Sequence, residues 1–238
     1  MTAPPRIALS IGAELRGWEA EAIAALREAQ GIALLGWMEA PGAGARKAAG
    51  RLPAAVERSM AGHPLLAISG SKALDGLERI GTPQAEGCDI ILHLGGAAPD
   101  ALQGTKGMRH WCYRHGDGEP GSAFPPGIRE SILGLPYARF RLVDCAEGML
   151  LQECAVPLEG DPAADAAAIA ALAARWPVQQ LRAIRAHGET PAVPAEPFAK
   201  LPAVNWWALW RWRWRRLLGR QVPRGFDESG PWNIGVLY

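Results

Sequence analysis

The sequence predicts an α/β protein built on a three-layer, mostly parallel twisted sheet with crossover helices. Short apolar runs of strand length recur along the chain, and segments of helical periodicity separate them. The first group is a strand over residues 6–11, a helix over 15–26 and a second strand over 32–37. Such a unit is typical of a parallel sheet, because the helix carries the chain back across the sheet.

The later elements continue this pattern as far as residue 188. A loop over 41–51 leads into a helix over 54–60. The strands are expected at 88–94, 110–115, 137–143 and 149–157, and the helices at 128–135, 161–176 and 178–187. Asp161 followed by Pro162 predicts a helix N-cap and first turn. The chain of 238 residues can therefore bury one core in a domain over 1–188 and still carry an appendage.

Composition excludes several classes of protein. Basic residues number 25 against 24 acidic ones, so no nucleic-acid partner is expected. The chain lacks both a bilayer-length apolar run and a secretory signal at its start, which favours a cytoplasmic location with or without membrane association. The histidines lack metal-binding spacing, so no metal is expected. Reduced buried thiols are favoured over a disulfide or a metal site for the four cysteines, at 88, 112, 145 and 154.

The segment over residues 88–117 is the best candidate for a ligand site. A buried strand is followed by Gly95 and Gly96, and the next strand ends in His115, with Asp117 two residues later. Ligands of open α/β sheets bind outside the carboxyl ends of the strands. The glycine pair would let a planar ligand approach the backbone, although a simple strand-to-helix turn explains it equally well.

The run Asp-Ile-Ile-Leu-His-Leu-Gly-Gly from Asp89, the helix start at Pro99 and the strand ending at His115 resemble the formyltransferase family. This family includes methionyl-tRNA formyltransferase and sugar formyltransferases, and the resemblance covers residues 5–188. It implies a Rossmann-like fold and transfer of a formyl group from formyltetrahydrofolate to an amine. In the family an asparagine and a histidine stabilise the oxyanion, and a later aspartate assists proton removal.

Carried onto this chain, the resemblance retains one catalytic position outright. His115 matches the family histidine, whereas Tyr113 occupies the asparagine position and Asp117 opens an altered loop. Glu147 could replace the aspartate, and Gly95 with Gly96 would lie against the folate. From the residues alone, His115 is equally explained as a strand-end histidine that hydrogen-bonds a neighbouring loop.

The chain beyond residue 188 divides into three parts. Prolines recur over 189–204, as in an extended tether, and a helix over 205–219 and a tail over 220–238 follow. Asn205 can cap this helix. Tryptophans gather on one face and arginines flank it, with Trp212 as the exception on the polar side. The residues expected to make contacts are Trp206, Trp207, Trp210, Trp214, Arg211 and Arg215.

Three partners suit this helix: the domain itself or a partner protein, a membrane surface, and, least favoured, nucleic acid. In the tail, Pro-Trp-Asn-Ile-Gly-Val over 231–236 resembles the opening strand of a bacterial domain. That domain is similar to plant glucosamine inositolphosphorylceramide transferases. The resemblance implies a functional link to a glycosyltransferase-type domain.

Two functions follow from these patterns. The first is a degenerate, non-catalytic formyltransferase-like module that accompanies a glycan- or lipid-modifying transferase. The alternative is an active formyl transferase that uses formyltetrahydrofolate and an amino sugar or amino-lipid head group. In the alternative, His115 and Tyr113 would stabilise the oxyanion, and Glu147 or Asp117 would be the acid–base partner.

Overall fold

The computed structural model describes most of the domain and the helix near the carboxyl end. The described residues are 4–12, 15–40, 58, 60–67, 69–81, 87–95, 107–115, 125–188, 193–197, 201 and 204–217. Of the predicted helix over 54–60, Arg58 and Met60 are described, and both are helical. The tail over 220–238 lies outside the described residues.

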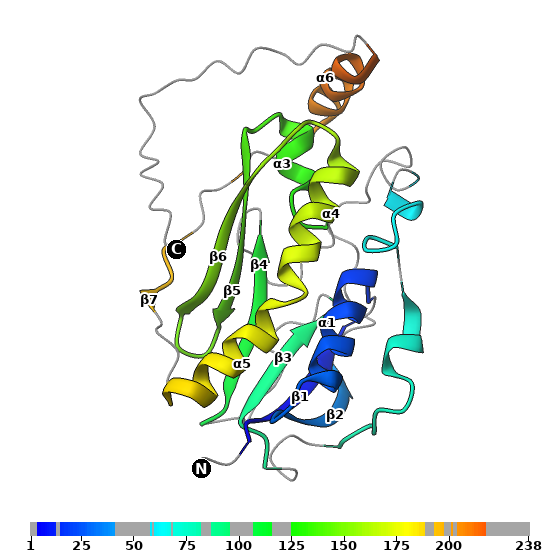
Figure 1. The fold of residues 1–238 in the computed structure, drawn as a ribbon. Coiled ribbons are helices and arrows are strands. Elements are labelled where there is room, and N and C mark those ends of the chain that lie inside the picture. Colours follow the sequence, from blue (N-terminus) through cyan, green and yellow to red (C-terminus); the bar gives the residue numbers. More distant parts are fainter. Residues whose placement is uncertain are drawn as a thin grey trace.

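A seven-stranded sheet in the order β2-β1-β3-β4-β5-β6-β7 organises the described residues (Figure 1). The first four strands are parallel to one another, and each later strand is antiparallel to its neighbour. Five strands therefore share one direction, which confirms the predicted α/β class. The strands are β1 Arg6–Ile11, β2 Ala33–Glu39, β3 Ile90–Leu94, β4 Arg109–His115, β5 Tyr137–Asp144, β6 Met149–Pro157 and β7 Val193–Pro194.

Three helices cover one face of the sheet: α1 Gly17–Glu28, α4 Pro162–Ala173 and α5 Trp176–His187 (Figure 1). The strand residues under them are buried and apolar, as expected for a sheet whose face is covered by crossover helices. They include Leu9, Leu92, Trp111, Phe140 and Leu142, all fully buried. The connections that would supply the predicted third layer fall largely outside the described residues. The other described helical segments are η2 Gly70–Leu74, α3 Ile128–Leu133 and α6 Trp206–Leu217.

The N-terminus of α4 follows its sequence signal. The Asp161 carboxylate accepts a hydrogen bond from the Ala163 amide (3.1 Å), so the predicted cap of α4 is confirmed.

The amide of Gly17, where α1 begins, donates to the Ala67 carbonyl (2.9 Å). Any side chain at Gly17 would collide with the carbonyl oxygen of Pro64, which crosses the helix there. Glycine is therefore required at this position by close approach of two backbone segments.

Part of the predicted tether belongs to the sheet. Within residues 189–204, strand β7 pairs with the start of β6. The buried Arg141 guanidinium on β5 donates to the Glu196 carbonyl, at 2.6 Å, and to the Glu153 carboxylate, at 3.0 Å. A buried arginine needs such partners, because an unpaired buried charge is costly. The described part of the segment is thereby held against the domain.

The expectation of four reduced thiols is wrong for one pair of cysteines. Cys112 on β4 and Cys145, just after β5, form a disulfide, and their Cα atoms are 6.5 Å apart. The two residues meet because β5 runs antiparallel to β4, with Val143 opposite Cys112. Cys88 and Cys154 are reduced. Disulfides persist mainly in oxidising compartments, so this pair does not support the expected cytoplasmic location.

Candidate functional site

The carboxyl ends of β1, β3 and β4 meet at one edge of the sheet, where the sequence places the ligand site. Gly12, just after β1, donates its amide hydrogen to the Leu94 carbonyl at the end of β3 (2.9 Å). Gly95 follows with φ of 62°, a left-handed conformation that favours glycine. The chain therefore turns sharply away from the sheet at this edge.

A buried carboxylate, which the sequence interpretation missed, joins this edge to helix α1. Glu19 accepts hydrogen bonds from the Gly95 amide (2.7 Å) and from the Arg16 amide (2.9 Å). Burial raises the pKa of Glu19 from 4.5 to about 6, although the two amides and the Arg16 charge act in the opposite direction. An acidic residue such as Glu19 in the first turn is a helix-start signal, but nothing local in the sequence reveals the bond to Gly95. Because Gly95 donates to Glu19, its amide is already engaged within the protein.

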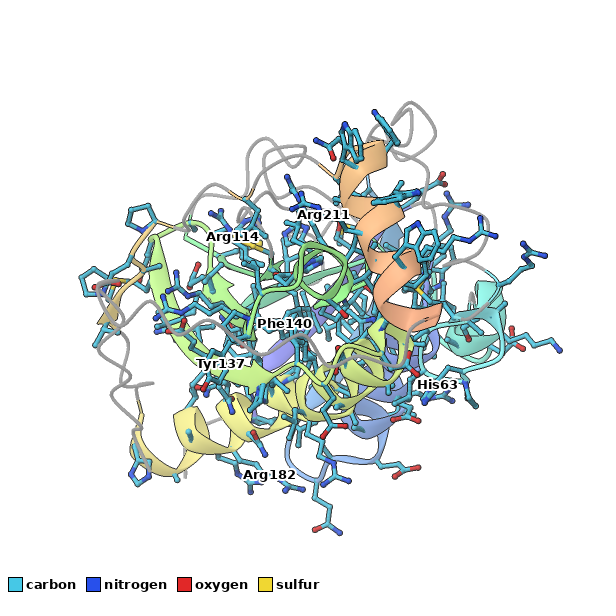
Figure 2. All side chains as sticks on the ribbon, turned by 90° about the horizontal axis from the view of Figure 1, so that it is seen from above. His63, Arg114, Tyr137, Phe140, Arg182 and Arg211 are labelled. Carbon is cyan, nitrogen blue, oxygen red and sulfur yellow. A yellow bond between two sulfur atoms is a disulfide. The ribbon has the colours of Figure 1, made fainter. Side chains whose placement is uncertain are left out.

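Four aromatic side chains pack together beneath the edge. Tyr113 lies edge-on to Trp18, with ring centroids 4.9 Å apart, and stacks on Phe140 at 5.3 Å. Trp176, at the start of α5, lies 5.4 Å from Phe140. Figure 2 shows Phe140 in the middle of the molecule, surrounded by side chains from several elements. The group therefore joins the sheet to helices α1 and α5, and aromatic pairs of this geometry contribute about 0.5–1.5 kcal/mol each beyond burial.

The hydroxyl of Tyr113 is held inside this group. It donates a hydrogen bond to the Ala173 carbonyl, at 2.9 Å, where α4 ends. In a continuous helix the amide four residues later would donate to that carbonyl, but Pro177 stands there and has no N–H. Burial, and then the Glu19 charge, raises the pKa of Tyr113 well above its ordinary value. Tyr113 thus fills the gap in backbone bonding between α4 and α5, rather than presenting its hydroxyl to a ligand.

His115 stands at the end of β4 and is half-buried. It lies opposite Phe140 in the strand pairing, and the two rings are 5.7 Å apart. Residues two apart on a strand share a face, so His115 is on the same face of the sheet as Tyr113. The structure therefore brings His115 to the aromatic group.

Glu147 is separated from His115 by the direction of β5. His115 pairs with Phe140, whereas Asp144 pairs with Trp111, four residues earlier on β4. Glu147 lies in the turn beyond Asp144, so it is displaced from His115 by more than about 13 Å along the strands. Glu147 therefore does not contact His115, and its role as acid–base partner stays a prediction. Gly96 and Asp117 lie outside the described residues.

A second polar group lies on the opposite face of the sheet. Nε2 of His93 is 3.1 Å from Nδ1 of His110, and both rings are buried. Burial, and then His110, lowers the pKa of His93 to about 3, so His93 is neutral at physiological pH. Ser10, also buried, pairs laterally with His93 in the sheet. Strand alternation points these side chains away from the His115 face, so they do not complete its site.

The described residues contain no group of three or more His, Cys, Asp or Glu side chains arranged to hold a metal ion. Glu19 is bound by two backbone amides, and Asp144 accepts from the His110 amide (3.3 Å) and the Ala146 amide (3.1 Å). Burial raises the pKa of Asp144, despite these two hydrogen bonds. These two carboxylates therefore accept hydrogen bonds from backbone amides at opposite ends of the sheet.

Solved structures similar to this chain include formyltransferases. Glycinamide ribonucleotide transformylase 1 from Symbiobacterium toebii is 17% identical, over 79% of this chain and 90% of that one, with a TM-score of 0.45. Phosphoribosylglycinamide formyltransferase from Brucella melitensis is 18% identical, over 78% and 97%, with a TM-score of 0.41. A variant of HypX from Aquifex aeolicus is 10% identical, over 85% and 30%, with a TM-score of 0.46.

No protein-family model and no curated protein matches the sequence. With TM-scores below 0.5, function has to be judged from the chain's own residues.

Replacing Tyr113 with Phe should destabilise the protein. The substitution keeps the ring contacts but leaves the buried Ala173 carbonyl without its donor, so we expect the free energy of unfolding to fall by about 1 kcal/mol. Urea unfolding measures the change. Tyr137→Phe is the matched control, because that side chain is 37% exposed, and it should leave stability unchanged. Equal stability of Tyr113→Phe and the wild type would contradict a structural role for the hydroxyl.

Glu19 should make stability depend on pH in the acidic range. Its pKa is higher in the folded protein, about 6 against 4.5, so the folded state holds the extra proton between these values. Its contribution to stability is therefore greatest below pH 4.5 and falls by about 2 kcal/mol as the pH rises to 7. Urea unfolding across this range should show that Glu19→Gln lacks this fall. Glu21→Gln, on the exposed side of α1, should keep it; identical pH profiles for all three proteins would contradict the assignment.

Proposed function

We propose that residues 5–188 form a degenerate formyltransferase-like domain, a non-catalytic module that accompanies a glycan- or lipid-modifying transferase. The hydrogen bond from the Tyr113 hydroxyl to the Ala173 carbonyl carries the proposal. In the family that the sequence resembles, the residue two before the histidine donates to the oxyanion. In this chain that position is Tyr113, whose side chain is buried in the hydrophobic core.

Oxyanion stabilisation requires donors aimed at the point where charge develops, at about 3 Å. To serve there, the Tyr113 hydroxyl would have to leave Ala173, and the carbonyl would then be buried without a donor. The ring would also leave its contacts with Trp18 and Phe140. The cost of these losses supports a structural rather than a catalytic tyrosine.

The proton-transfer part of the reaction also lacks support. Attack by an amine requires a base within hydrogen-bond reach of the reacting nitrogen. Glu147 lies toward the other end of the strands from His115. Glu19 has a pKa suited to a base, about 6, but both its oxygens accept hydrogen bonds from backbone amides. His115 alone does not supply oxyanion stabilisation together with amine activation.

The association with a transferase is the more specific part of the proposal. It rests on the resemblance of residues 231–236 to the start of a transferase-type domain, and these residues lie outside the described part of the chain. A non-catalytic module would act by placing such an enzyme, or by binding the same substrate surface, rather than by one-carbon chemistry.

Titration of the full chain with a stable formyl-folate analogue tests the proposal. Isothermal calorimetry should show no saturable heat at affinities tighter than about 1 mM, because the described residues of the site do not combine a free oxyanion donor with a base. A known formyltransferase provides the positive control. His115→Ala and the exposed His187→Ala should both behave as the wild type does. Saturable binding that His115→Ala abolishes and His187→Ala preserves would favour the active formyl transferase.

A further inference from the structure

Helix α6 is attached to the domain through a face that the helical periodicity did not single out. Ala208 and Trp212 are buried, at 5% and 7% exposure, and belong to the main hydrophobic core. Asn205 accepts a hydrogen bond from the Ala208 amide (2.9 Å), so the predicted N-cap is confirmed. Trp212, expected on the polar side, instead lies on the docking side. Figure 1 shows α6 beside α3 at one end of the molecule.

This attachment leaves four tryptophans facing outward. Exposure is 62% for Trp206, 51% for Trp207, 47% for Trp210 and 44% for Trp214. Their rings contact one another in sequence, with centroids 4.1, 5.7 and 5.6 Å apart. We call these four residues the indole ladder. A contiguous exposed aromatic surface of this kind marks an interaction site rather than chance exposure.

The charged side chains of helix α6 itself all have one sign. Helix α6 contains four arginines and no acidic residue. Arg211 and Arg213 are exposed, and Figure 2 shows Arg211 on the α6 side of the molecule. Arginine donates bidentate hydrogen bonds to phosphate, and the indole ring has an apolar body with a polar N–H. The ladder and its arginines thus match a surface that has an apolar interior and an anionic outer layer.

We propose that the indole ladder binds the surface of a membrane containing anionic lipids, with α6 lying in the plane of the head groups. Tryptophan and arginine on one amphipathic helix suit this interface, where rings reach the acyl boundary and guanidinium groups meet phosphates. The helix has 12 residues, about 18 Å, and none of the described helices is long and apolar enough to cross a bilayer. The proposal concerns surface binding and does not depend on whether the domain is catalytic.

Lipid is favoured over a protein groove because the reverse side of α6 is already docked. Because α6 is held against the domain, its indoles form one row. The whole row can enter the head-group region of a membrane, where the lipids move aside. A protein partner would need a long apolar groove with acidic rims. Helix α6 has no acidic residue that could pair with a basic group of such a partner and fix its orientation. The arginines of α6, with no acidic residue on the same helix, instead match the uniform negative charge of anionic head groups.

Vesicle flotation with the full chain tests this inference. We expect the wild type to float with phosphatidylcholine vesicles that contain phosphatidylserine and to stay unbound with phosphatidylcholine alone. Trp210→Ala combined with Trp214→Ala should weaken binding about tenfold or more, because two indoles no longer enter the interface. Leu172→Ala is the matched control, since Leu172 is 50% exposed on α4 and lies off the ladder; it should bind as the wild type does.

Further measurements separate lipid from other occupants. Arg211→Gln combined with Arg213→Gln should weaken binding to the anionic vesicles, and brominated lipid should quench wild-type fluorescence more than that of the double tryptophan variant. Unchanged melting temperatures would show that the variants fold. Failure of the wild type to bind, equal binding by the tryptophan variant, or equal binding to neutral vesicles would overturn the proposal. So would a dimer, detected by light scattering, that the tryptophan variant abolishes and vesicles do not compete with.

Discussion

The hydrogen bond from the Tyr113 hydroxyl to the Ala173 carbonyl is the constraint on which the domain's architecture depends. Pro177 interrupts backbone bonding between α4 and α5, and the phenol supplies the missing donor from the sheet. The aromatic group around Tyr113 then fixes α1 and α5 over the same strands. One side chain thus satisfies a buried backbone group and joins strand β4 to helices α1, α4 and α5.

This constraint limits which polar groups are available to a ligand at the edge of the sheet. The edge keeps the form of an α/β site, with strand ends, a glycine turn and His115. Two of its described polar groups, however, are used by the protein itself: Glu19 joins Gly95 to α1, and Tyr113 joins β4 to α4. Groups committed in this way stabilise the fold, whereas a catalytic group must be available to the reacting atoms. The membrane binding that we propose for the indole ladder on α6 does not depend on this edge.

Local signals in the sequence predicted much of the fold. Apolar runs located the strands, and the Asp161 and Asn205 caps are confirmed because capping depends on residues within one turn. Contacts between distant segments were not predictable in this way. The bond from Gly95 to Glu19 spans 76 residues, and the Cys112–Cys145 disulfide spans 33. The direction of β5, which separates Glu147 from His115, and the burial of Trp212 also depend on packing rather than on local pattern.

The ionisation of Tyr113 tests the central claim most directly. In a protein carrying Tyr137→Phe and Tyr238→Phe, Tyr113 is the sole phenol, and ultraviolet difference absorbance reports its ionisation. Burial and the Glu19 charge raise its pKa well above the ordinary value, about 10. We therefore predict that the phenolate forms only as circular dichroism records unfolding at alkaline pH. Reversible ionisation near pH 10 with the fold intact would show that the hydroxyl is available to solvent, contradicting the account.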